Sequence, residues 1–230
     1  MKNSIKKIKM NAVELKNVYI TNDVTEICEN VSLKIKLKEM IYLTGKTGIG
    51  KSSILKTLYG EQRVQKGELF VLGLNMNKIK NKDMPFLRRK MGIVFQDFQL
   101  LYDRSVYDNL SFVLKATGWK DQSKIKTRCE YILETINLQE KSKSMIHKLS
   151  SGQQQKLCIG RSLLNHPDII IADEPTGNLD TETSSEIMNL ICKIHKLGKT
   201  IIIATHDEKI IKLFPAKKLK LENKSLIELN

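Results

Sequence analysis

The sequence lacks long apolar runs and any secretory leader. Its longest apolar runs, such as residues 169–172 and 201–204, are far shorter than the roughly 18 to 20 residues of a membrane-spanning helix. The basic residues 1–9 are not followed by the apolar segment that a signal peptide needs. Both absences argue against a membrane span and an exported protein, so we expect a cytoplasmic one.

Closely spaced cysteines and aromatic residues are also scarce. No two cysteines have the spacing of a zinc site or redox pair, so we expect free buried thiols at Cys28, Cys129, Cys158 and Cys192. Phe, Tyr and Trp make up 6% of the chain, which offers little for stacking on bases. The formal charge of +14 comes from lysines spread along the whole chain. It fits a solvated surface or attraction to anionic lipid, and no specific nucleic-acid binding is expected.

Alternating strand and helix patterns predict an α/β protein. With 230 residues, 41% of them apolar, the chain can form a single domain over residues 1–230. Such alternation favours a mainly parallel sheet covered on both faces, with ligands at the carboxyl ends of its strands. Buried strands are expected at 40–44, 168–172 and 201–205, and amphipathic helices at 125–138 and 187–197. Short segments at 31–37, 68–72 and 218–229 predict an additional antiparallel part.

A glycine-rich stretch between the first strand and a helix matches the phosphate-binding P-loop. Its glycines let backbone N–H groups face phosphates, and the helix that follows adds the positive end of its dipole. Lys51 is expected to reach the β- and γ-phosphates of ATP, and the Ser52 hydroxyl to bind Mg²⁺. The expected ATP contacts are Gly45, Lys46, Thr47, Gly48, Ile49, Gly50, Lys51, Ser52 and Ser53.

Two acidic residues follow the second buried strand. Asp173 is placed to bind the Mg²⁺ held by Ser52, and Glu174 to act as general base for an attacking water. A P-loop alone does not separate kinases from ATPases and GTPases, because all of them neutralise and align a phosphoryl group. The second carboxylate favours hydrolysis, although an isolated Asp-Glu pair could also be a solvated strand end.

Residues 149–153 resemble the signature motif of ABC ATPases. The resemblance implies a P-loop NTPase fold and ATP hydrolysis, and it implies a homodimer on ATP binding, because the signature of one subunit covers the γ-phosphate held by the other. Ser150 is a suitable N-cap for the following helix. Ser151 stands where the family has glycine, and we expect it to weaken the closed dimer. The motif comprises Leu149, Ser150, Ser151, Gly152 and Gln153.

Further family markers occur in the same order along the chain. The resemblance implies a Q-loop role for Gln96 in catalysis and Mg²⁺ binding, a D-loop role for Asp180, and a γ-phosphate contact for His206. Tyr19 is either the aromatic residue that stacks on adenine or a strand residue packed in the core. The resemblance also implies an ATPase core over residues 1–96 and 166–230, with a helical subdomain over residues 97–165.

One stretch is more specific. Residues 85–97 and 100–109 resemble the FtsE family of bacterial cell-division ATPases, whereas residues 172–180 are shared with lipoprotein-releasing and macrolide-export ATPases. The FtsE resemblance implies an integral membrane partner like FtsX, a peripheral position on the inner face of the cell membrane, and control of cell-wall hydrolases. The alternative is the ATPase of a lipoprotein-releasing or macrolide-export transporter. An ATPase associated with nucleic acid and a division-site scaffold that hydrolyses little are the other hypotheses. Four apolar residues either grip a helix of the partner or pack in the core: Phe98, Leu100, Leu101 and Tyr102.

Overall fold

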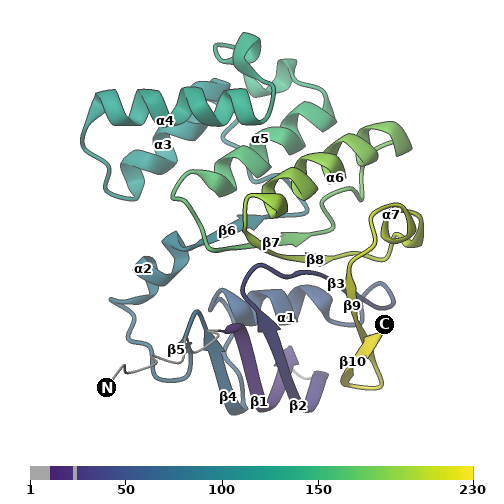
Figure 1. Ribbon diagram of the computed structural model, residues 1–230. Coiled ribbons are helices and arrows are strands. Elements are labelled where there is room, and N and C mark those ends of the chain that lie inside the picture. Colours follow the sequence, from purple (N-terminus) through teal and green to yellow (C-terminus); the bar gives the residue numbers. More distant parts are fainter. Residues whose placement is uncertain (1–10, 23–24, 230) are drawn as a thin grey trace, which may run out of the picture.

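The computed structural model describes residues 11–22 and 25–229, and its centre is a six-stranded sheet (Figure 1). The strand order is β10-β9-β3-β8-β7-β6, and every neighbouring pair is parallel except β9 with β10. The central strands are buried almost throughout because other elements cover both faces of the sheet. The strands are β3 (Met40–Thr44), β6 (Met91–Val94), β7 (Ile169–Asp173), β8 (Thr200–Ala204), β9 (Lys217–Glu222) and β10 (Ser225–Leu229).

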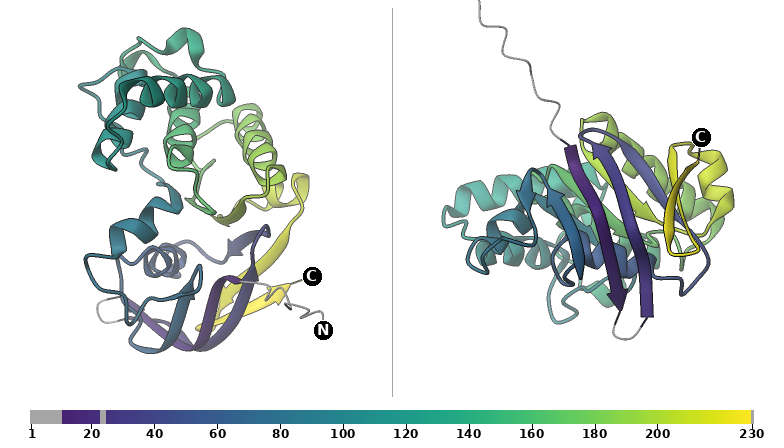
Figure 2. Two further views of the ribbon diagram at one scale, coloured as in Figure 1. Left: turned by 60° about the vertical axis from the view of Figure 1, so that its left-hand side comes forward. Right: turned by 90° about the horizontal axis from the view of Figure 1, so that it is seen from below.

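A smaller antiparallel sheet covers one face, as the view from below in Figure 2 shows. Its order is β2-β1-β4-β5. Helix α1 (Lys51–Leu58) lies between the two sheets, and its apolar side chains share one hydrophobic core with both of them (Figure 1). The strands are β1 (Asn11–Asn22), β2 (Thr25–Lys36), β4 (Lys66–Val71) and β5 (Leu74–Asn75).

Helices form the layer on the opposite face. Figure 1 shows α5 and α6 over the central sheet, with α3 and α4 beyond them. Their apolar side chains join those of β3, β7 and β8 in a second core. The helices of this layer are α3 (Val106–Ala116), α4 (Gln122–Thr135), α5 (Ser151–Leu163), α6 (Thr181–Lys196) and α7 (Glu208–Leu213), with short 3₁₀ turns at Gln139–Lys141 and Ile146–Lys148. Helix α2 (Met84–Arg89) is separate, because its buried Leu87 packs in the first core. Within residues 11–22 and 25–229, none of the helices has the length and apolar character to span a bilayer.

The expected strands and helices are confirmed, with shifted ends. The strands expected at 168–172 and 201–205 each begin and end one residue away, as β7 and β8. Helix α4 begins before residue 125 because the Asp121 side chain accepts hydrogen bonds from the Ser123 and Lys124 N–H groups. The free thiols are also confirmed, with Cys192 half-buried and the other three buried.

The expectation for residues 218–229 was wrong in one respect. We expected them in the antiparallel part, but β9 pairs in parallel with β3 and extends the central sheet; only β10 runs antiparallel, as the second strand of a hairpin. Strand β1 was not expected at its full length. It is the strand between β2 and β4, and its register shifts disturb the alternation that would indicate a strand.

Candidate functional site

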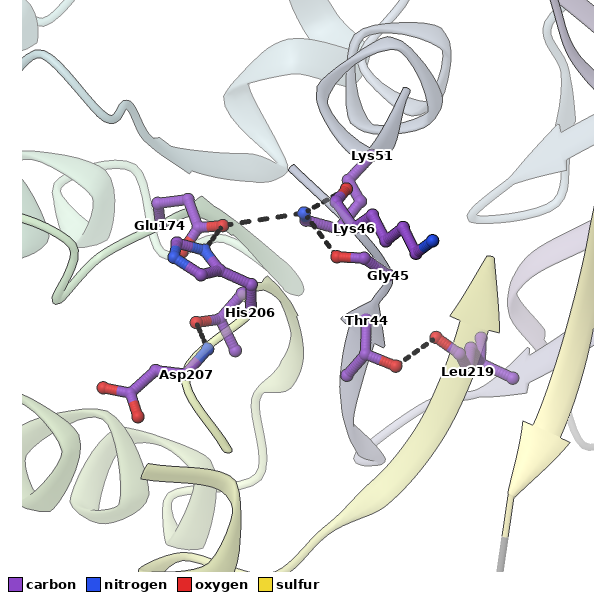
Figure 3. Close-up of polar contacts among 9 residues, drawn as sticks. Thr44, Gly45, Lys46, Lys51, Glu174, His206, Asp207 and Leu219 are labelled. Atoms are coloured by element: carbon purple, nitrogen blue, oxygen red, sulfur yellow. Dashed lines mark hydrogen bonds and ion pairs between the residues drawn. The ribbon is translucent and has the colours of Figure 1, made fainter. Parts of the chain in front are cut away.

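Three neighbouring parallel strands end beside one another and bring the candidate residues together. Strand β3 leads into the loop at 45–50, β7 ends at Asp173, and His206 follows β8 by two residues. Figure 3 shows Lys51, Glu174 and His206 directed toward each other from these three segments. The loop and His206 also line a cleft of about 620 Å³, within the size range of small-molecule sites. Its other basic lining residues are Lys46, Lys218 and Lys220.

Two glycines of the P-loop have backbone conformations that disfavour other residues, but their surroundings differ. Gly48 has φ +77°, and a Cβ placed there would meet no atom within 4 Å. Gly50 differs, because it caps α1 with φ +112° and a Cβ there would lie 2.4 Å from Ile27 Cγ2. One glycine therefore permits close packing beneath the loop, and the other leaves its outer side free for a ligand.

Lys51 is the first residue of α1 and is only 6% exposed. Its ammonium group donates to the carbonyl oxygens of Gly45 at 3.0 Å and Lys46 at 3.3 Å (Figure 3). The same Nζ lies 3.8 Å from Glu174 Oε1. The buried Lys51 ammonium has three N–H donors. It is therefore held by two carbonyl oxygens of the loop and by the Glu174 carboxylate.

Asp173 is a partly buried carboxylate with spare binding capacity. Among the described residues its Oδ1 is buried and has no hydrogen-bond partner. Burial raises the pKa of Asp173, and a hydrogen bond with Ser52 partly offsets this effect. An unpaired carboxylate oxygen next to a hydroxyl is the kind of oxygen donor set that a hard divalent cation prefers. The pair therefore fits a magnesium ion.

Glu174 occupies an unusual backbone position and contacts His206, which lines the cleft. Its φ is +46°, and its N–H donates to the Ala204 carbonyl oxygen of the neighbouring strand at 2.9 Å. Glu174 Oε1 lies 2.7 Å from His206 Nδ1 (Figure 3). The His206 side chain is 55% exposed, so this contact spans the boundary between the protein and the open cleft.

Gln96 and Tyr19 take no part in the contacts among Lys51, Glu174 and His206. Gln96 is exposed two residues after β6, and in the part of the chain that the structure describes its side chain makes no hydrogen bond. Tyr19 lies in β1 but is only half-buried, and the Lys66 ammonium sits 5.6 Å from the centre of its ring. The core-packed alternative for Tyr19 is therefore wrong, and adenine stacking stays a prediction.

The signature residues begin α5. Ser150 Oγ accepts from the Gln153 N–H at 3.3 Å, and Gln153 Oε1 accepts from the Ser150 N–H at 3.1 Å, which is a capping box. Ser150 and Ser151 are exposed, whereas Gly152 is buried against Thr183 of α6. No hydrogen bond joins residues 150–153 to residues 45–53 in the described ranges.

Asp180 caps the helix that Gly152 contacts. Its carboxylate accepts from the Thr183 N–H at 2.9 Å and from the Thr183 hydroxyl at 2.6 Å. These hydrogen bonds lower the pKa of Asp180. The sequence identified Asp180 as a D-loop residue but gave no indication that it also fixes Thr183 against the signature glycine.

The chain was also compared with known proteins. A family model described as ABC transporter matches residues 28–177. The cell division ATP-binding protein FtsE of Streptococcus pneumoniae strain D39 is 40% identical over 93% of each chain. FtsE of Bacillus subtilis is 38% identical over 92% of each chain. FtsE of Escherichia coli K12 is 39% identical over 80% of this chain and 82% of the relative.

Two solved structures are similar over nearly the whole chain at 30% identity. One is the post-hydrolysis dimer of the ATP-binding cassette MJ0796 bound to ADP and Pi, with a TM-score of 0.84 over 95% of this chain and 98% of that one. The other is cbiO1 from Clostridium perfringens, part of the ABC transporter complex cbiONQ. Its TM-score is 0.86 over 95% of this chain and 87% of that one.

Proposed function

This chain belongs to the ABC transporter family of ATPases, and we propose that it is the ATP-hydrolysing subunit of a membrane complex like that of FtsE. One observation carries the proposal: Lys51, Glu174 and His206 meet at the ends of neighbouring strands, beside an unpaired Asp173 oxygen. A base, a cation and a site for a metal are what phosphoryl transfer to water requires. The FtsE relatives match over most of the chain, and they point to a role in cell division.

ATP binds with its phosphates in the loop that starts at Gly45 and ends in the first turn of α1 at Ser53. The left-handed backbone at Gly48 and Gly50 lets the loop curl, and successive backbone N–H groups donate to the phosphate oxygens. Lys51 exchanges the carbonyl oxygens of Gly45 and Lys46 for the β- and γ-phosphate oxygens. The exchange is favourable because a phosphate oxygen carries negative charge, so it attracts the ammonium group as an ion pair, whereas a carbonyl oxygen is neutral.

Asp173 and Ser52 are the protein groups that would hold Mg²⁺, with Gln96 approaching from the loop after β6. A bound Mg²⁺ neutralises charge on the β- and γ-phosphates and orients them. The raised pKa of Asp173 and its orphan oxygen both support this assignment, because a cation would relieve the burial of an uncompensated carboxylate.

Glu174 activates the attacking water. Its carboxylate accepts a proton as the water oxygen forms a bond to the γ-phosphorus, while the bond from that phosphorus to the bridging oxygen breaks and its electron pair leaves with ADP. His206 holds Glu174 from the next strand and contacts the γ-phosphate. Lys51 lies 3.8 Å from the same carboxylate oxygen, so binding of ATP, which draws Lys51 away, frees the base.

The complete site forms between two copies of the chain. Ser150 and Ser151 are exposed at the start of α5, where the helix dipole and a hydroxyl can meet the γ-phosphate of the other copy. Gly152 and Gln153 complete that half of the site, Asp180 supports it from α6, and Tyr19 stacks on adenine. The dimer of the similar cassette MJ0796 bound to ADP and Pi supports this arrangement.

A groove of about 530 Å³ is the proposed docking site for a cytoplasmic helix of an integral, FtsX-like partner. It lies between the β6 edge and α3 and α5, and Phe86 stands beside it, 62% exposed. Leu100 is buried in the core, so it does not grip the partner, whereas Tyr102 is exposed. The partner would hold the chain at the inner face of the cell membrane. The groove is lined by Pro85, Arg88, Arg89, Met91, Gly92, Ile93, Phe95, Gln99, Val113, Ala116, Thr117, Arg161, Ser162 and Asn165.

Two variants test the chemistry. Glu174→Gln should lower the ATP turnover number by about 10²- to 10⁴-fold, the usual contribution of a general base, and accumulate an ATP-bound dimer in size-exclusion chromatography. Lys51→Ala should lose nucleotide binding and stay monomeric. Unchanged turnover in Glu174→Gln would refute the assignment of the base.

The role in the cell is tested by capture of the partner. The tagged chain, extracted from membranes in mild detergent with ATP, should bring down an FtsX-like integral protein. The Phe86→Asp variant should recover less of it, while its own ATPase activity is kept. Recovery of a lipoprotein-releasing or macrolide-export permease would contradict the cell-division role.

A further inference from the structure

The segment that follows Gln96 has a strained backbone. Phe98 and Gln99 are consecutive non-glycine residues with φ of +57° and +53°. Left-handed conformations are rare for such residues, and they persist only where surrounding groups hold them in place. The position of Gln96, two residues earlier, therefore depends on whatever fixes this turn.

Helix α5 supplies the groups that fix it. Arg161 donates through Nη2 to the Phe98 carbonyl oxygen at 2.6 Å and through Nη1 to the Gln99 carbonyl oxygen. Cys158 Sγ, one turn earlier, lies 3.1 Å from the same Phe98 oxygen. Within residues 11–22 and 25–229, Arg161 forms no salt bridge, and burial lowers its pKa. Its planar guanidinium thus serves the two carbonyls of one strained turn.

The same helix is fixed at both of its ends. A Cβ on Gly92 of β6 would lie 2.5 Å from the Ser162 carbonyl oxygen, so α5 rests directly on the strand that leads to Gln96. The helix begins at Ser151 in the signature, and Arg161 lies about 15 Å farther along it, at 1.5 Å per residue. A displacement of the signature end is therefore transmitted to the turn after Gln96.

We propose that Arg161 is a positioning residue for ATP hydrolysis. It holds Phe98 and Gln99 in their left-handed conformation, sets the position of Gln96, and ties that loop to the helix that starts at the signature. The inference rests on the proposed function, because it takes Gln96 as a contact of the nucleotide and its metal. Arg161 itself does not touch ATP.

The test compares two conservative variants of the full-length chain. Arg161→Lys keeps the charge but not the planar pair of donors. Arg128→Lys is the matched control, because Arg128 also donates to two carbonyls, those of Leu163 at 2.5 Å and Leu164 at 3.0 Å at the end of α5, but to neither carbonyl of the turn at Phe98 and Gln99. Both variants should lower the melting temperature. Only Arg161→Lys should lower kcat, by about tenfold to a hundredfold, while the Kd for ATP without Mg²⁺ is unchanged.

A double-mutant cycle decides whether Arg161 acts through Gln96. In a Gln96→Ala background, Arg161→Lys should cause no further loss of kcat, because the group that it positions is already missing. Cys158→Ala, a milder change at the same turn, should lower kcat less and in the same direction. The inference would be overturned if the kcat losses of Arg161→Lys and Gln96→Ala multiplied in the double variant. It would also be overturned if Arg128→Lys lowered kcat as much as Arg161→Lys does. An inactive wild-type chain would instead refute the proposed function.

Discussion

Replacement of Gly152 with alanine tests how the signature is built into the fold. A Cβ at this position would lie 2.4 Å from Thr183 Cγ2, whereas carbon atoms in contact normally stay about 3.5–4.0 Å apart. Helices α5 and α6 would have to separate by roughly 1 Å at their N-terminal ends. Overpacking of this kind costs about 1–3 kcal/mol, and the better helix propensity of alanine returns at most about 1 kcal/mol.

From the middle of the overpacking range, about 2 kcal/mol, and a return of up to about 1 kcal/mol, the expected net loss is about 1–2 kcal/mol. This corresponds to a fall of roughly 2–8 °C in melting temperature for a chain of this length. Calorimetry or urea unfolding of the nucleotide-free protein measures it. Separation of α5 from α6 moves the first turn of the signature helix, so the ATP-dependent dimer should weaken as well. Size-exclusion chromatography of Gly152→Ala in the Glu174→Gln background measures this effect.

A second substitution isolates the contact. Thr183→Ser removes Cγ2 but keeps the hydroxyl that donates to Asp180 Oδ2 at 2.6 Å. The next nearest atoms to the new Cβ, Thr183 Cβ and Oγ1, are 3.8 and 3.9 Å away, which is ordinary contact. Gly152→Ala should therefore be tolerated in the Thr183→Ser background. An alanine variant as stable as the wild type, or a double variant no better than the single one, would refute the reasoning.

Substitutions at three other positions probe the site. Burial raises the pKa of Asp173, so its contribution to stability is fully present below the ordinary pKa of 3.8 and is lost as pH rises through the raised value. Asp173→Asn should thus stabilise the nucleotide-free chain against urea more at pH 8 than near pH 4, and an equal effect at both would contradict this. Asp180→Ala should lower the melting temperature by loss of the helix cap, and Asp180→Asn should lower it less, as thermal unfolding would measure. Gly48→Ala should weaken ATP binding, followed by fluorescent-nucleotide titration, because a residue with a Cβ is strained at φ +77° and the loop that presents its N–H groups would shift.

The strands that carry the site were predictable because of where they lie in the fold. Strands β3, β7 and β8 are buried on both faces, so each reads as an unbroken apolar run that ends at a chemical motif. Parallel strands end at a common edge, so the sequence already placed Lys51, Glu174 and His206 near one another. Their measured contacts, 3.8 Å and 2.7 Å from Glu174 Oε1, agree with that prediction.

The outer strands were harder to place because their pairing is not encoded locally. Strand β9 alternates half-buried lysines with buried Leu219 and Leu221, a pattern that suits an edge in either sheet. Its partner β3 lies more than 170 residues earlier, and no local feature of β9 indicates that they pair in parallel. In the same way, Tyr19 follows a register shift in β1, and this irregularity leaves the ring half-buried between two buried neighbours.

Arg161 was missed for a more general reason. Its side chain donates to the main-chain carbonyl oxygens of Phe98 and Gln99. Because every residue has a carbonyl oxygen, the side chains of Phe98 and Gln99 give no sign of this contact in the sequence. The motifs could be recognised because side chains do their chemistry, and they identify the groups that meet ATP. The contacts that connect those groups run through main-chain atoms, and in this chain they join a signature helix to a turn about 60 residues earlier. Coupling between the two halves of the site therefore has to be found in the structure.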